Sequence, residues 1–350
     1  MREERIVVLA EATGRCLSRG CGPAAPLHWV DTLTVWKFDP AMLVVLLLSI
    51  AGYTLGVRRY QREEGHWPLP RTFCFAAAAI LFTLATMSFI GAYEKVLFWD
   101  RALQCAMLLM TTPLFLACSA PLTLATTGEG RDAQLVRRVI ASKPLRLLTF
   151  PLVVSVILLV TPYAFYFTGW YLTSLTNTFV DETLHLELLA VGFLYFWTRV
   201  QIDPVPKKFP HMISVWISLV EGIGDAGVGV ALWLGGTLVA GDYYAALSTL
   251  PHSVLYGQLS LGATSGLAWN QAFGGAVFWI VGDITSIPLL GALWRGLRKD
   301  EEVAADLGQE NLELVEVEFA PGDGSVQERF RPWWETDPEL SSRYGGGAAE

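Results

Sequence analysis

The residues that could do chemistry in this sequence are ionisable and amide side chains inside long apolar segments. A charged side chain costs free energy in such surroundings, so it usually pairs with another group or binds something. Arg101 can compensate two or more carboxylates, which gives an internal ion-pair network; the alternative is a site that handles an ion. We interpret nine residues of four segments as one intramembrane polar cluster: Arg101, Gln104, Asp181, Glu187, Glu221, Asp225, Asn270, Gln271 and Asp283.

One residue of the same segments, Cys105, could be a ligand of a soft metal ion. It follows Arg101 by four residues and therefore lies on the same face of a helix. Thiolate sulfur selects Cu(I). Met107 and Met110 point to other faces, and we interpret them as core residues, so a copper site would need ligands from other helices. We identify no catalytic residue.

The elements that must position these residues are membrane-spanning helices. Of the 350 residues, 53% are hydrophobic and 17% are charged, against about 25% charged residues in soluble domains. Apolar blocks of about 20 residues suffice to cross a bilayer, and backbone groups in lipid must be bonded within the segment. The sequence predicts an all-α integral membrane protein, a bundle of about seven transmembrane helices near residues 39–57, 72–93, 97–125, 146–167, 182–201, 212–236 and 271–296.

The distribution of lysine and arginine predicts the orientation of these helices. Alternate loops are rich in basic residues, whereas the loops 168–181 and 237–270 contain none. Basic loops stay in the cytoplasm, so the N-terminus is expected outside and the C-terminus in the cytoplasm. We expect a largely external extension at 1–38, a membrane domain at 39–297 and a partly disordered acidic cytoplasmic tail at 298–350. The location predicted is the bacterial plasma membrane, crossed several times.

Composition also argues against several classes of function. The net charge of −8 disfavours nucleic acid as a partner. We find no nucleotide-binding loop and no Ser/His/Asp set with plausible spacing, so we expect neither nucleotide binding nor enzyme activity. Membrane lipid is the partner that the apolar segments imply.

Four segments carry the pattern of a known family. The first reads LFWDRALQCAMLLMTTPLFLACSAPLTLA, the second DETLHLELLAVGFLYFW followed by QIDPVP, and the third GDAGVGVAL. The fourth joins Asn270-Gln271, Gly274-Gly275 and Asp283. In order and spacing they resemble the CtaG-type cytochrome c oxidase assembly factors, over about residues 28–300. The resemblance implies a seven-span fold, a place in the respiratory chain, haem–copper oxidase subunits as partners and a role in supplying copper.

The departures from the family pattern concern the implied metal site. Of the positions where the family has histidines, only His185 is histidine in this sequence. The other five positions hold Arg101, Cys105, Asp181, Glu187 and Asp225. Carboxylates prefer harder cations than copper, and an arginine repels any cation. Of the site that the resemblance implies, Cys105 and His185 remain as candidate metal ligands. We therefore predict a divergent member whose Cu(I) binding is weak or absent.

Three functions follow as hypotheses. The first is an assembly factor for cytochrome c oxidase that binds or delivers little copper. The second is an accessory or structural membrane subunit that has lost the metal site. The third is a cation or proton pathway through the intramembrane carboxylates Glu187, Asp225 and Asp283.

Overall fold

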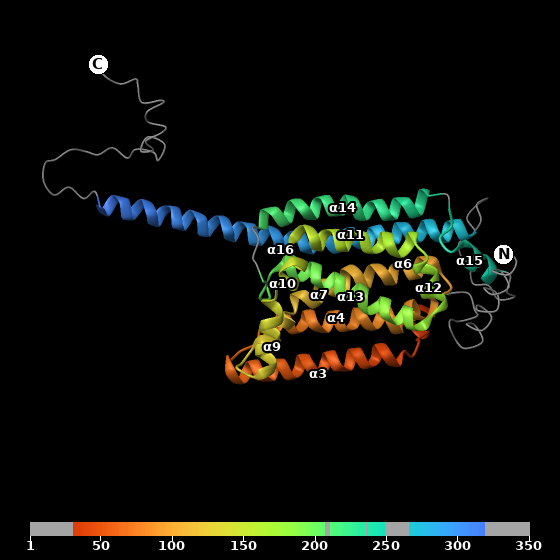
Figure 1. Ribbon diagram of the computed structural model, residues 1–350, viewed down its shortest axis with the longest axis horizontal. Helices are drawn as coiled ribbons and strands as arrows, with labels where there is room; N and C mark the ends of the chain where they lie inside the picture. Colours follow the sequence, from red (N-terminus) through yellow and green to blue (C-terminus); the bar gives the residue numbers. More distant parts are fainter. Residues whose placement is uncertain (1–30, 207–210, 236, 249–265, 319–350) are drawn as a thin grey trace, which may run out of the picture. The chain divides into compact units, whose positions relative to one another are not determined.

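The computed structural model describes residues 31–206, 211–235, 237–248 and 266–318, and in these ranges the chain forms helices and no strand (Figure 1). Two compact units divide at Asp300, and the first contains the helical bundle. Its long elements are α3 (Pro40–Glu63), α4 (Leu69–Met87), α6 (Phe98–Ala106), α7 (Thr112–Cys118), α11 (Pro151–Phe167), α13 (Thr178–Val200), α14 (His211–Leu234) and α16 (Gly266–Glu318), which continues into the second unit.

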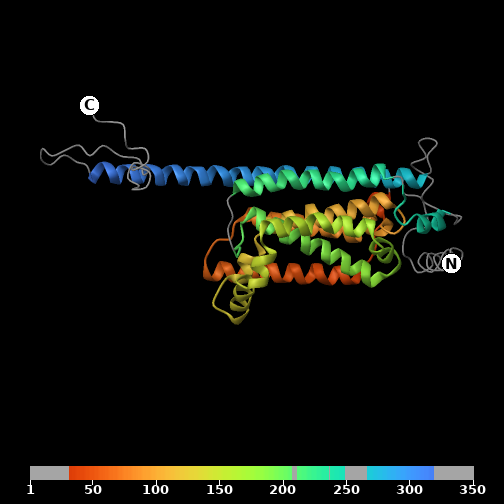
Figure 2. The same ribbon diagram turned by 45° about the horizontal axis from the view of Figure 1, so that its top comes forward.

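Short helices connect these elements: α2 (Asp31–Thr34), α5 (Phe89–Tyr93), the π-helical η1 (Met107–Thr111), α8 (Pro121–Thr126), α9 (Arg131–Ile140), α10 (Lys143–Leu148), α12 (Trp170–Thr176) and α15 (Gly241–Ser248). In both views α3, α4, α11, α13 and α14 run along a common direction (Figures 1 and 2). The segment α6–η1–α7 packs between α4 and α13 and forms the centre of the bundle.

The third predicted span, 97–125, contains Pro113 and Pro121, and prolines at these positions are expected to kink it. In the structure the π-helical turn η1 lies just before Pro113, and the helix ends at Cys118. Ala120 takes a left-handed conformation (φ 55), and Pro121 then starts the separate helix α8. The second break has a local cause, since a left-handed residue followed by proline cannot continue an α-helix.

Gly192 allows α13 to approach the central segment at this irregular turn. Pro113 lacks an N–H and cannot donate to the carbonyl of Leu109 four residues earlier. A Cβ at position 192 would overlap the Leu109 carbonyl oxygen and lie 2.5 Å from Cγ of Pro113. The backbone of α13 therefore rests directly against the interrupted helix, as small residues allow in membrane bundles.

Four helical stretches of the described ranges are long and apolar enough to cross a membrane: Pro40–Glu63, Leu69–Tyr93, Phe98–Cys118 and Leu267–Arg295. A fifth is added if α11 and α12, which meet at a bend of 67°, count as one span. Two other long helices are not among these four stretches. By itself α11 is only 17 residues long, and α13 contains four charged residues, Asp181, Glu182, Glu187 and Arg199. The full count of seven spans and the orientation stay predictions.

Replacing Gly192 by alanine should destabilise the bundle. The added Cβ must displace a backbone carbonyl, and overpacking of this kind costs about 1–3 kcal/mol. Thermal unfolding of the detergent-solubilised protein should show a lower melting temperature. Gly52→Ala in α3 is the matched control, because nothing lies within 4 Å of a Cβ at that position. Equal melting temperatures for both variants would contradict the close approach.

Candidate functional site

A fully buried arginine lies at the centre of the candidate site. Arg101, in the first turns of α6, is 0% exposed. Its Nη2 donates to Oδ1 of Asp181 at 2.6 Å, and its Nη1 donates to Oε1 of Gln104 at 2.7 Å. Nη1 also lies 3.4 Å from Oε2 of Glu94 and 3.3 Å from Nε2 of His185. One guanidinium thus joins three segments of the bundle.

Glu94 is the second hub of the network. It lies in the connection between α5 and α6. The short helix α5 before it is capped by Ser88, whose hydroxyl accepts from the backbone N–H of Ile90. Its carboxylate accepts from Nζ of Lys37 at 2.7 Å and from Nε2 of Gln104 at 2.6 Å. Lys37 is also tied to α4, because its backbone N–H donates to the carbonyl of Met87.

Burial and ion pairing oppose each other at this hub. Burial alone would raise the pKa of Glu94, but Lys37, His185 and Arg101 outweigh it and hold that pKa well below its usual range. Burial likewise would lower the pKa of Lys37, and the neighbouring carboxylate of Glu94 more than compensates, so this pKa is raised. Both groups are therefore charged at neutral pH.

A capped helix supplies the other carboxylate. Asn177 begins α13 by accepting from the backbone N–H groups of Phe179 and Val180, and Asp181 follows in the first turn, where a negative charge is favoured. Oδ2 of Asp181 lies 3.0 Å from Nζ of Lys95. His185 lies one turn further along the same face, with Nε2 3.8 Å from Oδ1 of Asp181.

We define the ion network by its seven members: Lys37, Glu94, Lys95, Arg101, Gln104, Asp181 and His185. Three basic side chains, those of Lys37, Lys95 and Arg101, face two carboxylates. A third carboxyl group, that of Asp100, is also fully buried, and both of its oxygens lack a hydrogen-bond partner among the residues that the structure describes.

The donor set of the network does not fit copper. Ligand atoms of Glu94, Asp181 and His185 lie within 4.8 Å of one another, a spacing that could surround a metal ion. The guanidinium of Arg101, however, already contacts all three side chains. Two of the three donors are carboxylates, which suit hard cations better than Cu(I). Cys105 is buried one turn after Arg101, as predicted, but does not belong to this group of three.

The nine predicted cluster residues do not form one cluster. Arg101, Gln104 and Asp181 meet in the ion network, whereas Glu221 joins a separate buried group. There its carboxylate accepts from Nη2 of Arg199 at 2.9 Å and from the hydroxyl of Tyr195 at 2.6 Å. The expectation of a single site is therefore corrected.

The remaining predicted residues have other places. Asn270 and Gln271 bond to backbone groups: Asn270 accepts from the N–H of Trp99, and Gln271 accepts from that of Val239. Glu187 and Asp283 are exposed on the surface of the bundle. The side chain of Asp225 lies outside the described residues.

Sequence reasoning missed Lys37, Glu94 and Lys95. All three lie at the ends of apolar segments rather than inside them, where a charged residue attracts no attention in the sequence. The feature that could have revealed Glu94 and Lys95 is the short connection Glu94–Leu97 between two helices. A connection of this length holds its charged residues against the ends of the helices.

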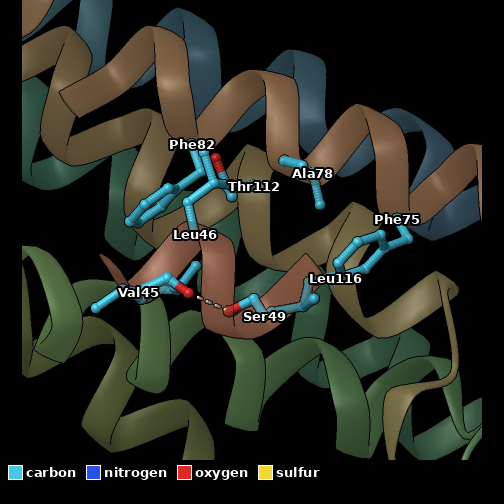
Figure 3. Close-up of a pocket in the computed structure, with 10 residues that line it drawn as sticks. Val45, Leu46, Ser49, Phe75, Ala78, Phe82, Thr112 and Leu116 are labelled. Atoms are coloured by element: carbon cyan, nitrogen blue, oxygen red, sulfur yellow. Dashed lines mark hydrogen bonds between the residues drawn. The ribbon is translucent and has the colours of Figure 1, made fainter. Parts of the chain in front are cut away.

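A crevice beside α3 is the other candidate site, and it is apolar (Figure 3). Its empty volume, including the open mouth, is about 360 Å³. The lining residues come from α3, α4, α7 and α13: Val45, Leu46, Ser49, Phe75, Ala78, Ala79, Phe82, Thr112, Leu116 and Leu189. The hydroxyl of Ser49 already donates to the carbonyl of Val45. None of these ten described lining residues is charged, so the crevice suits an acyl chain rather than an ion.

Comparisons with known proteins agree with the resemblance found in the sequence. The profile of a family described as cytochrome c oxidase caa3 assembly factor (Caa3_CtaG) matches residues 51–300. Uncharacterized proteins of Mycobacterium bovis and Mycobacterium tuberculosis are each 25% identical over 282 residues, which is 78% of this chain and 41% of the relative. One of Mycobacterium leprae is 23% identical over 288 residues, 80% of this chain and 42% of the relative.

The chain thus spans about two fifths of the length of these curated relatives. No solved structure matches it.

A double-mutant cycle should show that Arg101 and Asp181 stabilise the fold together. Asp181→Asn strands a buried guanidinium and should cost about 3–5 kcal/mol. Arg101→Gln should also lower the free energy of unfolding. The double variant should lose less than the sum of the two single variants, with a coupling energy of about 0.5–3 kcal/mol. Chemical or thermal unfolding in detergent measures all four proteins. Strictly additive losses would contradict the ion pair.

Proposed function

The chain belongs to the cytochrome c oxidase caa3 assembly factor family, and we propose that it assists assembly of a haem–copper oxidase as a protein scaffold without a copper site. The observation that carries the proposal is the guanidinium of Arg101, which contacts the side chains that would otherwise surround a metal ion. Family membership supports the assembly role, and the donor set supports the loss of copper chemistry.

The proposed setting is the bacterial plasma membrane, crossed seven times, with the N-terminus outside. Seven helical segments would serve as spans: α3, α4–α5, α6–α7, α11, α13, α14 and α16. The apolar character of four of them supports this arrangement. Charges in α13 are compatible with a span because Asp181 and His185 are buried against Arg101, and Arg199 is buried against Glu221.

The ion network would then lie at the external end of the bundle. It holds the residues before α3, the connection between α5 and α6, and the start of α13 in one fixed arrangement. A fixed external surface is what an assembly factor needs in order to receive oxidase subunits. An accessory or structural subunit that has lost the metal site would use the same features, and it is the second candidate.

A cation or proton pathway has less support. Glu187 and Asp283 are exposed on the surface of the bundle, where they cannot line a route through its interior. The fixed charge of Arg101 also opposes the passage of any cation past the network.

Cu(I) binding should be weak or absent. Competition of the purified protein against a calibrated Cu(I) chelator should show no tight stoichiometric site. Arg101→His removes the guanidinium and adds an imidazole beside His185, so this variant should bind copper more tightly than the natural chain. Tight binding by the natural chain that disappears in both Cys105→Ser and His185→Ala would restore a role in copper delivery.

Deletion of the gene for this protein should lower the amount of assembled oxidase. Expression of the Cys105→Ser variant in the deletion strain should restore the full amount of oxidase. A scaffold needs no thiolate, whereas delivery of Cu(I) through Cys105 would require one. The measurement is the haem absorbance of the oxidase in membranes of a deletion strain that carries each variant. The assembly role fails if deletion leaves the oxidase unchanged. Scaffolding without copper fails if Cys105→Ser, expressed at normal level, behaves like the deletion.

A further inference from the structure

Helices α9 and α10 present apolar side chains that the bundle does not cover. Five residues of this pair and its exit are between 41% and 66% exposed: Leu135, Val139, Leu147, Leu148 and Phe150. Leu135 and Val139 are adjacent on one face of α9, four residues apart. Exposed apolar side chains gathered on two consecutive short helices point to an interaction surface.

Basic residues border the same patch. Arg131, Leu135 and Arg138 follow one another at intervals of four and three residues, so they lie along one side of α9. Lys143 and Arg146 are exposed on α10. Asp132 is the one acidic residue between positions 131 and 148. The surface therefore combines exposed leucine and valine with an excess of positive charge.

The remaining contacts of α9 fix its position at one end of the bundle. Arg137 does not join the basic surface, because its guanidinium donates to the carbonyls of Thr126 and Gly128. A Cβ at Gly130 would lie 2.7 Å from Nη2 of Arg59, so the turn before α9 packs closely against the end of α3.

The direction of α9 differs from that of the long helices. In both views it runs across the end of α3 rather than along it (Figures 1 and 2). If the long helices cross a bilayer, α9 lies in the plane of the membrane surface. This is the placement of an interfacial amphipathic helix, whose apolar side chains enter the boundary between headgroups and acyl chains.

We propose that α9 and α10 bind anionic phospholipid at the cytoplasmic surface of the membrane. The apolar side chains would reach the acyl chains, and Arg131, Arg138, Lys143 and Arg146 would bind the phosphate groups. Charge complementarity selects the occupant, since each basic residue near an anionic surface strengthens attraction to it. The inference concerns lipid alone and does not depend on which oxidase the protein assists.

Lipid preference of the full-length protein in detergent tests the proposal first. Titration with phosphatidylglycerol and with phosphatidylcholine, followed by native mass spectrometry, should show at least tenfold tighter binding of the anionic lipid. Arg138→Gln/Arg146→Gln should reduce this preference about tenfold. The control Arg58→Gln/Arg62→Gln removes the same charge from the end of α3 and should reduce it less than threefold. Equal binding of the two lipids, or equal losses in both double variants, would overturn the proposal.

A spin label at position 139 tests the placement independently. In vesicles that contain phosphatidylglycerol, the label should be accessible to oxygen and shielded from a water-soluble relaxation agent. Full exposure of the label to the water-soluble agent would overturn the proposal. Shielding that persists in vesicles without anionic lipid would also overturn it, because protein rather than lipid would then cover position 139.

Discussion

A buried guanidinium keeps its charge at any pH that a cell meets, so carboxylates must be brought to Arg101 from other parts of the chain. The structure brings Asp181 from the start of α13 and Glu94 from the connection before α6. Lys37 and Lys95 then pair with those same carboxylates and prevent an excess of negative charge. Because removal of one member strands the others, the network constrains where α3, α5, α6 and α13 begin or end.

Further contacts hold α13 along the rest of its length. A second buried pair, Arg199 with Glu221, joins α13 to α14 near the other end of α13. Between the two pairs, α13 rests on the interrupted segment α6–η1–α7, and Gly192 permits backbone contact beside Pro113. Polar links at both ends and close apolar packing between them give α13 one defined register.

The helical class with apolar spans and the pairing of Arg101 with a buried carboxylate could be predicted, because apolar block length and the cost of buried charge are local properties. The sequence could not predict how the other polar residues group in space. Glu221 and Asp181 both lie in apolar segments and were expected to meet, yet Asp181 pairs near the start of α13 and Glu221 pairs with Arg199 near its end. Lys37 and Lys95 escaped prediction because they enter the network from positions next to the helices.

We propose that a guanidinium takes the place of a metal ion in this member of the family. Anomalous diffraction at the copper edge, from crystals exposed to Cu(I) under reducing conditions, tests this replacement most directly. We predict no anomalous peak among Glu94, Asp181 and His185, and guanidinium density of Arg101 within hydrogen-bonding distance of Asp181. A strong peak bound by His185, with Arg101 displaced from Asp181, would contradict it.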